Sequence, residues 1–374
     1  MALASSHVPA VSPPAARPSW NPLKFTGTQL PVELLTMVKV LALVVLLTNH
    51  VRLMPDPWLP FVPALDLLPH VLFQRTLEIV FVTSALALLF NRRVRLASLV
   101  LGSTMLLAIV SSKAYYGNNK TFCGLMFFLT GLYVPGKSAW PVRWQLGITY
   151  FGAGLNKLLD GDWQTGVFFE NWAVNRLHQP WYMALDSLLP PMLLARLLCW
   201  TTIVTELGVV PAIFIPQLHY WAVCANVLFQ SGLLLFTGTT FTLFFYSMTA
   251  ASLAFVTWPA GPLTVLYDAD RGLPYRLRRA LQFCDADRLF RWTPYQSRVE
   301  EWLYLAIGDK IYRNFRALRM IVLLNPLTYL TIAALIAAVP EFQAATYRRI
   351  VVASCLFLLM PPLAWIADRV WSRL

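Results

Sequence analysis

The clearest signal for chemistry in this sequence is a lysine near the end of an apolar stretch. Lys157 lies within YFGAGLNKLLDGDWQTG, residues 150–166. A lysine at such a position can extend to the lipid headgroups and remain charged. If its side chain points inward under an apolar cover, desolvation favours the neutral amine, which can act as a general base. Asp160 is a candidate ion-pair partner for the charged form. Gly152 and Gly154 favour close helix packing in lipid.

Three more ionisable residues fall within apolar stretches, where each costs about 2.5–3.5 kcal/mol to insert into a bilayer. Glu78 follows Arg75 by three residues, so an ion pair within one helix accounts for it. A hydrogen bond between helices accounts for Glu206. His219 is either a structural histidine or a second catalytic candidate. The sequence carries no HExxH, P-loop, GxSxG or paired-cysteine motif, so no metal site is predicted.

The segment around Lys157 resembles the HTTM domain, the membrane fold shared with vitamin K-dependent γ-carboxylase. That motif reads roughly Ala-Gly, two residues, Lys-Leu, an acidic patch and Trp-x-x-Gly. The matching residues here are, in order, Ala153, Gly154, Lys157, Leu158, Asp162, Trp163 and Gly166. The resemblance covers about residues 30–258, including His219. It implies that Lys157 is the base that deprotonates a reduced quinone.

The resemblance has two departures. The carboxylases carry a Trp-Asn-Asn-His stretch, for which the nearest segment here is Tyr-Gly-Asn-Asn-Lys, residues 116–120. The large lumenal domain that handles their peptide substrate has no counterpart after Trp258, which argues against glutamate carboxylation. The residues predicted to line a binding site are Asn118, Asn119, Asp162, Trp163 and Trp172.

A second resemblance lies in the segment LTVLYDADRGLPYRLRRALQF, which looks like the start of the DCC family of thioredoxin-like proteins. The motif of that family is Tyr-Asp-Gly-Asp-Cys-x-x-Cys followed by a basic helix. Tyr267, Asp268 and Asp270 match it, whereas Arg271 and Pro274 stand at the two cysteine positions. Without a thiol pair, thiol-disulfide exchange is excluded at this site. The resemblance then implies a docking module. Its predicted contacts with partners or anionic lipid are Arg276, Arg278 and Arg279.

Membrane-spanning helices must position these residues. The chain has 374 residues, of which 57% are hydrophobic and 13% charged, whereas soluble domains carry about 25% charged residues. Apolar stretches of about 17 to 22 residues recur, each able to cross a hydrocarbon layer of about 30 Å. Eight spans are predicted, at about residues 32–50, 71–90, 95–112, 121–135, 141–157, 191–214, 218–236 and 239–258. Two further stretches, near 320–339 and 350–367, predict a C-terminal hairpin. The first is expected to span the membrane, and the alternatives are a re-entrant hairpin or a helix pair lying on the surface.

The charge distribution predicts which ends of the helices face the cytoplasm. The net charge of +12 resides mainly in short loops and in one basic segment after Trp258. Such loop charge sets topology, so no nucleic-acid partner is predicted. A cytoplasmic N-terminus places the arginines at 92–95 and the basic region 271–319 in the cytoplasm. The acidic, Trp-rich loop at 160–189 then lies outside, as amphipathic helices on the membrane surface. A bacterial inner membrane is the predicted location.

The predicted fold is therefore an all-α polytopic membrane helical bundle with a small α/β thioredoxin-like cytoplasmic segment. A flexible tail is expected at 1–30, the HTTM-like bundle at 31–258, the DCC-like segment at 259–319 and the hydrophobic hairpin at 320–374. Within the DCC-like segment the pattern predicts a strand, a basic helix and a second strand. The five cysteines, scattered without paired spacing, are interpreted as small buried hydrophobes.

Two functions of different classes remain open. The loss of the DCC cysteines and of the Asn-His pattern favours a non-catalytic or accessory subunit of a membrane-protein complex. The retained lysine motif and its Trp-rich loop indicate the alternative, a membrane enzyme with Lys157 as base. No cofactor is predicted beyond a quinone-like or lipid ligand. An inward-facing Lys157 in a pocket would favour the enzyme, and a lipid-facing one the accessory subunit.

Overall fold

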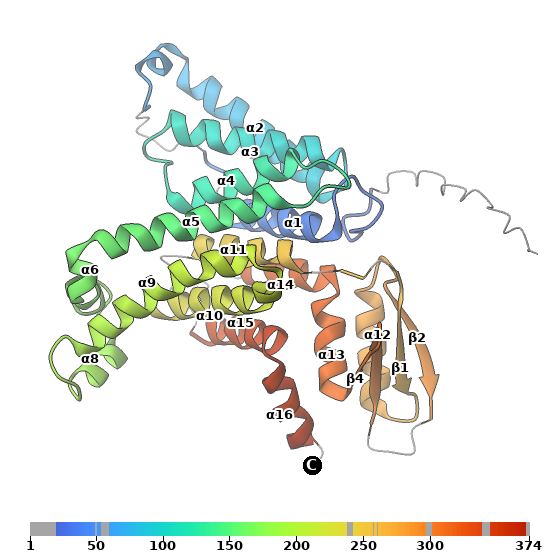
Figure 1. Ribbon diagram of the computed structural model, residues 1–374. Helices are drawn as coiled ribbons and strands as arrows, with labels where there is room; N and C mark the ends of the chain where they lie inside the picture. Colours follow the sequence, from blue (N-terminus) through green and yellow to red (C-terminus); the bar gives the residue numbers. More distant parts are fainter. Residues whose placement is uncertain are drawn as a thin grey trace, which may run out of the picture.

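The computed structural model describes residues 20–48, 51–53, 60–237, 242–256, 258–259, 261–296, 301–338 and 345–371. Within these residues, helices form a long bundle and one small sheet lies at one end of it (Figure 1). Residues 1–19, which make up most of the predicted tail, lie outside the described residues.

The first part of the bundle contains five helices. They are α1 (Val32–Leu47), α2 (His70–Leu89), α3 (Val94–Ser111), α4 (Asn118–Gly131) and α5 (Trp140–Leu159), with a 3-10 turn, η1 (Pro63–Leu67), before α2. Helix α1 is central, because it packs against α2, α4, α11 and α14 and buries residues on all its faces. A helix that is apolar all round is expected to lie in the core of a bundle in this way.

The acidic, Trp-rich loop folds into short helices at the end of the bundle opposite the sheet (Figure 1). They are α6 (Gly161–Thr165), α7 (Val167–Asn171), a π-helical turn η2 (Trp172–Arg176) and α8 (Pro180–Asp186). The chain then returns through α9 (Leu193–Phe214), η3 (Pro216–Leu218), α10 (His219–Thr237), α11 (Thr242–Ala251) and η5 (Ser252–Phe255). This loop therefore covers the end of the bundle where α5 finishes and α9 begins.

The structure does not confirm the eight membrane spans that the sequence predicts. Helices occur at all eight positions, but among the residues that the structure describes four segments are both long and apolar enough to cross a bilayer: α2, α3, α9 and Pro216–Thr237. Two bent helix pairs raise this number to six if each is counted as one span. Helices α1, α4 and α11 have 16, 14 and 10 residues, whereas a span needs about 17 or more. The eight-span prediction is thus not confirmed.

The small sheet is mixed and has four strands, in the order β2-β1-β3-β4. Its elements are β1 (Leu263–Asp268), α12 (Gly272–Phe283), β2 (Phe290–Tyr295), β3 (Leu303–Ile307), β4 (Lys310–Arg313) and α13 (Asn314–Leu323). Strand β1 is parallel to β2 and antiparallel to β3, which is antiparallel to β4. The predicted strand, helix and strand are therefore present. Apolar residues up to Leu324 join the core of the sheet, so α13 extends it past residue 319, the expected boundary.

The stretch predicted as one span at 320–339 is divided. Helix α13 packs on the sheet, whereas α14 (Pro326–Ala338) packs on α1, and the two meet at 79°. Pro326 has no amide hydrogen to continue the first helix, and the Asn325 side chain accepts a hydrogen bond from Leu327 N at 3.1 Å, as an N-cap does. A second bend of 95° separates α15 (Ala345–Leu359) from α16 (Pro361–Trp371).

Residues 20–31, which we call the N-terminal strap, connect the bundle with the sheet. The Asp287 carboxylate, between α12 and β2, accepts hydrogen bonds from Phe25 N at 2.7 Å and Thr26 N at 3.2 Å. From the bundle, Lys39 and Asn91 donate to carbonyl groups of the strap. Phe25 is buried, so this part of the predicted tail is packed rather than flexible. The backbone carbonyl groups of Asn21, Pro22 and Lys24 accept these hydrogen bonds from side chains of the bundle, which explains why the strap is held in place.

Candidate functional site

Helices α5 and α9 approach each other closely at Gly154. A Cβ atom at this position would lie 2.8 Å from the side chain of Leu207 and 3.2 Å from Cβ of Glu206, so only glycine fits without a shift. Lys157 follows Gly154 by three residues and lies on the same side of α5. The close approach therefore brings the Lys157 side chain to Glu206 on the neighbouring helix.

Lys157 and Glu206 form an ion pair across this interface. Nζ of Lys157 lies 2.9 Å from Oε1 and 2.7 Å from Oε2 of Glu206. The Lys157 side chain is 19% exposed and that of Glu206 is 7% exposed. The ammonium group also lies 5.1 Å from the ring centre of Trp163, within the range of a cation–π interaction. The partner suggested by the sequence, Asp160, instead accepts a hydrogen bond from Asp162 N and caps α6.

The ion pair borders a cavity of about 1350 Å³ between α4, α5, α9, α10 and the short helices of the loop. Most of its wall is apolar, and a smaller number of polar and charged side chains is distributed along it. Those polar or charged residues are Asn118, Asn119, Gln145, Thr149, Asn156, Lys157, Arg176, Thr201, Thr202 and Glu206. Pockets that bind small molecules combine an apolar wall with a few converging polar groups in this way.

Aromatic rings form one end of the cavity, and we call them the aromatic roof: Trp163, Phe168, Phe169, Trp172, Trp181 and Phe236. Trp163 stacks on Phe168 with ring centres 4.3 Å apart, and Trp172 lies 5.4 Å from Phe236. Gly166 sets the turn between α6 and α7 at φ +91°, and its bare Cα lets the turn pack on the backbone of α9. Beside the roof, burial raises the pKa of Tyr182, which donates a hydrogen bond to Glu170.

Five of the seven residues predicted for catalysis or binding come together here. Lys157, Asn118, Asn119, Trp163 and Trp172 all line the cavity, although they come from three separate parts of the chain.

The other two predicted residues lie elsewhere. Asp162 is exposed on α6 and does not line the cavity. His219 packs against Phe255, with ring centres 5.2 Å apart, and Arg143 lies 5.1 Å from the same ring. Arg143 precedes Lys157 by 14 residues on α5, or about 21 Å at 1.5 Å per residue. His219 therefore lies near the opposite end of the bundle and does not act together with Lys157.

The sequence analysis predicted a hydrogen bond between helices for Glu206, but it missed Lys157 as the partner and the buried polar network beside the pair. The Tyr150 hydroxyl donates to Asn226, and Gln230 donates to Tyr150 at 3.0 Å. Asn226 also donates to the carbonyl of Met248 at 2.9 Å, which ties α5, α10 and α11 together. The signal in the sequence is the spacing of Asn226 and Gln230, which are four residues apart in the seventh predicted span and so lie on one face of a helix.

The three arginines predicted as contacts on helix α12 differ in their exposure to solvent. Arg276 and Arg279 are exposed, whereas Arg278 donates a hydrogen bond to the Tyr267 hydroxyl at 2.6 Å within the same module. At the first cysteine position of the DCC motif, Arg271 pairs with Asp268 at 3.1 Å.

Pro274 occupies the second cysteine position and is buried. The nearest cysteine along the helix is Cys284, ten residues further on. The described part of the chain also contains no group of three or more His, Cys, Asp or Glu side chains close enough to hold a metal ion.

Comparisons with protein-family models, curated proteins and solved structures give no match to this chain. The resemblances to the HTTM domain and to the DCC family thus stay predictions from sequence motifs. The cavity and the ion pair are observations of the structure and do not depend on either resemblance.

Proposed function

We propose that this chain is an integral membrane protein that binds one amphipathic molecule, quinone-like or lipid-like, in the cavity beneath the aromatic roof. The observation that carries this proposal is the position of the Lys157–Glu206 pair, which joins α5 and α9 and at the same time borders the cavity. A salt bridge that served packing alone would be enclosed by side chains. Here one side of the pair faces free volume of about 1350 Å³.

The composition of the cavity matches an aromatic or hydroxylated head with an apolar tail. Stacked tryptophan and phenylalanine rings offer flat apolar surfaces to a ring system, and the amide and hydroxyl groups near Lys157 offer hydrogen bonds to its oxygen atoms. Leu228, Phe229 and Leu233 continue the wall along α10 and would contact a tail. The volume exceeds the roughly 300 to 1000 Å³ of most small-molecule pockets, which leaves room for a tail.

The ion pair would exchange a proton with the ligand. Transfer of one proton from the Lys157 ammonium to Glu206 leaves a neutral amine and a neutral acid. The amine then takes the proton of a ligand hydroxyl, which produces a ligand oxyanion beside the restored ammonium ion. Proton and charge balance in each step. This role agrees with the function that the HTTM resemblance implies for Lys157.

Two glycines provide a matched test of the binding site. Gly152 lines the cavity and Gly208 faces outward on α9, and a Cβ at either position meets no atom within 4 Å. Gly152→Leu should therefore fill the cavity, and Gly208→Leu should leave it open, with similar effects on folding. The measurement is quenching of tryptophan fluorescence by a decyl-tailed quinone, using the full chain in mild detergent. We expect Gly152→Leu to weaken binding at least tenfold; equal affinities in both variants would reject the cavity as the site.

Lys157→Arg tests the proton transfer separately from binding. Arginine keeps the charge but cannot become a neutral base near neutral pH. The variant should retain quinol affinity within a few-fold and lose the absorbance of the bound quinol anion. Retention of that signal in Lys157→Arg would exclude Lys157 as the base.

A second candidate function is a non-catalytic accessory subunit. The small module favours it, because its motif carries Arg271 and Pro274 in place of cysteines and presents Arg276 and Arg279 at an exposed face of α12. A strand-helix-strand unit followed by a hairpin and a helix is compatible with the thioredoxin-like module that the DCC resemblance implies. Purification in mild detergent, with identification of co-purifying proteins, separates the two functions. A stoichiometric partner that is lost in Arg276→Glu/Arg279→Glu would support this one.

A further inference from the structure

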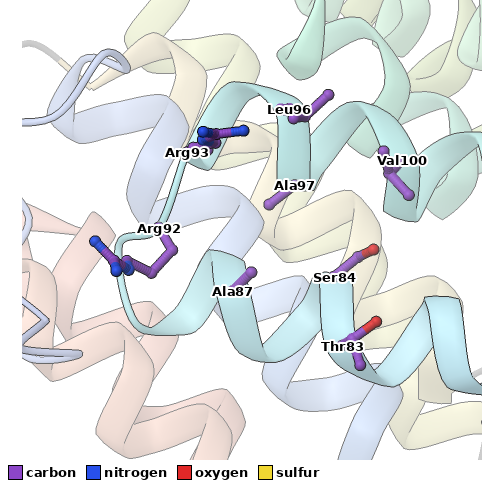
Figure 2. A pocket seen from close by; sticks show the side chains of 8 residues that line it. All are labelled: Thr83, Ser84, Ala87, Arg92, Arg93, Leu96, Ala97 and Val100. Carbon is purple, nitrogen blue, oxygen red and sulfur yellow. The ribbon is translucent and has the colours of Figure 1, made fainter.

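A groove of about 570 Å³ lies between α2 and α3, near the end of the bundle that carries the small sheet (Figure 2). Arg92 and Arg93 rise from the turn between the two helices and border one end of the groove. Its walls are made of small or apolar side chains, including Ser84 and Ala87 of α2 and Ala97 of α3. Because these side chains are short, the helices leave a channel that runs from the two guanidinium groups along the apolar surface.

The turn holds the two arginines in fixed positions. The Asn91 side chain donates to the carbonyl groups of Asn21 and Lys24 at 2.8 and 3.0 Å, which anchors the turn to the N-terminal strap. The guanidinium carbon of Arg92 lies 3.3 Å from the ring centre of Trp20. Arg93 has φ +42°, a left-handed conformation that costs about 1 kcal/mol or more in a residue other than glycine. The surrounding contacts hold the turn in a conformation that its residues do not favour alone.

The turn between α2 and α3 and the start of α3 carry three arginines, Arg92, Arg93 and Arg95. Within the described residues, neither Arg92 nor Arg93 forms an ion pair with a carboxylate. Arg95, in the first turn of α3, has a buried Nε that is without a hydrogen-bond partner. No side chain caps the N-terminus of α3, so its first backbone N–H groups also face this region. Guanidinium groups beside a helix N-terminus form a favourable site for an anionic phosphate.

We propose that this groove binds an anionic phospholipid, with the phosphate at Arg92 and Arg93 and one acyl chain along the channel. Both helices that form the groove are apolar enough to span a bilayer, and only 22% of the most apolar part of α2 is buried. The groove therefore opens onto a surface that hydrocarbon would cover, which a free phosphate ion would not use. Basic pockets between spanning helices bind anionic headgroups in the same manner. This site is separate from the cavity at Lys157, so it goes beyond the proposed function.

The test measures which lipids remain bound to the full chain. The protein is reconstituted in nanodiscs that contain equal amounts of phosphatidylglycerol and phosphatidylcholine, released into mild detergent, and analysed by native mass spectrometry. We expect wild type to retain phosphatidylglycerol preferentially and Arg92→Gln/Arg93→Gln to lose about tenfold of this preference. Lys137→Gln/Lys310→Gln removes two exposed charges outside the groove and should behave as wild type.

Two further variants keep the outcome decisive. Arg93→Gln alone leaves the Arg92–Trp20 contact in place, so its loss of preference cannot be attributed to a disturbed strap. Ala87→Phe fills the channel while both arginines remain, and it should also release the lipid. Equal retention of both lipids by wild type, or wild-type retention by Arg92→Gln/Arg93→Gln, would overturn the proposal. Displacement of the lipid by low millimolar inorganic phosphate would show that the groove recognises the free anion instead.

Discussion

Two lysines lie within apolar helices near opposite ends of the bundle, and their surroundings differ in kind. Lys39 on α1 is fully buried and donates to two backbone carbonyl groups at 2.7 and 2.8 Å, with the ring of Phe25 at 4.5 Å. Lys157 on α5 keeps 19% side-chain exposure, pairs with Glu206 and borders a cavity. The partners of Lys39 do not change their charge, whereas the partner of Lys157 can take up a proton.

The comparison teaches that burial of a charged group does not by itself mark a functional site. The ammonium group of a lysine has three hydrogens to donate. At Lys39 two carbonyls and an aromatic face satisfy them, so this lysine anchors the N-terminal strap. At Lys157 an ionisable partner and free volume lie together, which are the conditions for exchanging a proton with a bound molecule. The two regions can be distinguished by substitutions that separate folding from binding.

The largest expected effect is on folding and comes from Lys39→Met. The substitution removes two hydrogen bonds from a charged group: the Pro22 carbonyl loses its Lys39 donor, whereas the Lys24 carbonyl keeps the one from Asn91. Because a hydrogen bond to a charged group contributes about 1.5–3 kcal/mol, we expect a loss of roughly 2–5 kcal/mol of stability. The measurement is the apparent melting temperature of the full chain in mild detergent, together with the rate of tryptic cleavage after Lys24.

Thr36→Val is the matched control for Lys39→Met. Thr36 is equally buried on α1, but its hydroxyl donates to Val32 O within the same helix at 2.6 Å. Its replacement should cost below about 1 kcal/mol, because no strap carbonyl loses its donor. Equal melting temperatures for the two variants would show that Lys39 does not hold the strap.

A smaller effect is expected from Gly154→Ala, which acts on the ion pair through helix packing. The new methyl group would overlap Leu207 and force α5 away from α9, at a cost of about 1–3 kcal/mol. The same shift separates Lys157 from Glu206, so affinity for the decyl-tailed quinone should fall as well. Gly152→Ala adds a Cβ that meets no atom within 4 Å. This variant should be neutral or slightly stabilising, because alanine favours the helix. Similar results for both variants would mean that α5 and α9 tolerate displacement at this point.

The parts of this structure that sequence could predict are those fixed by local spacing. The Arg75–Glu78 pair, with 3.0 Å between its charged atoms, follows from a separation of three residues. Lys157 and Trp163 lie in one short segment, so their proximity also follows from the sequence. The strand, helix and strand at 263–295 were read from hydrophobic periodicity in the same way.

The remaining features depend on which helices pack together, which periodicity does not specify. Glu206 lies 49 residues from Lys157 and meets it only because Gly154 permits the α5–α9 approach. The strap contacts of Lys39 join segments whose packing has no local signature. His219 is a candidate as an ionisable residue in an apolar stretch and through the HTTM resemblance, but the packing places it near the opposite end of the bundle from Lys157. The hairpin of β3 and β4 was also missed, because its strands of 5 and 4 residues are too short for a clear alternation.

The smallest expected effect on stability, and the sharpest test of the comparison, comes from replacing both members of the ion pair. Lys157→Met and Glu206→Leu alone each leave one charge without its partner. Removal of one partner of a buried pair costs about 3–5 kcal/mol, and the open cavity should reduce this here because water can reach the remaining charge. We expect each single variant to lose about 1–2 kcal/mol.

The double variant Lys157→Met/Glu206→Leu should return to within about 1 kcal/mol of wild-type stability, since apolar residues of similar volume often replace a buried ion pair without cost. Its affinity for a quinol should nevertheless stay low, because no group remains to exchange a proton or bind the hydroxyl. Melting temperature and quinol titration of the four proteins complete a double-mutant cycle. A double variant as unstable as Lys39→Met would place Lys157 with Lys39 as a structural anchor. Recovery of stability without recovery of quinol affinity would show that the ion pair serves ligand binding rather than packing.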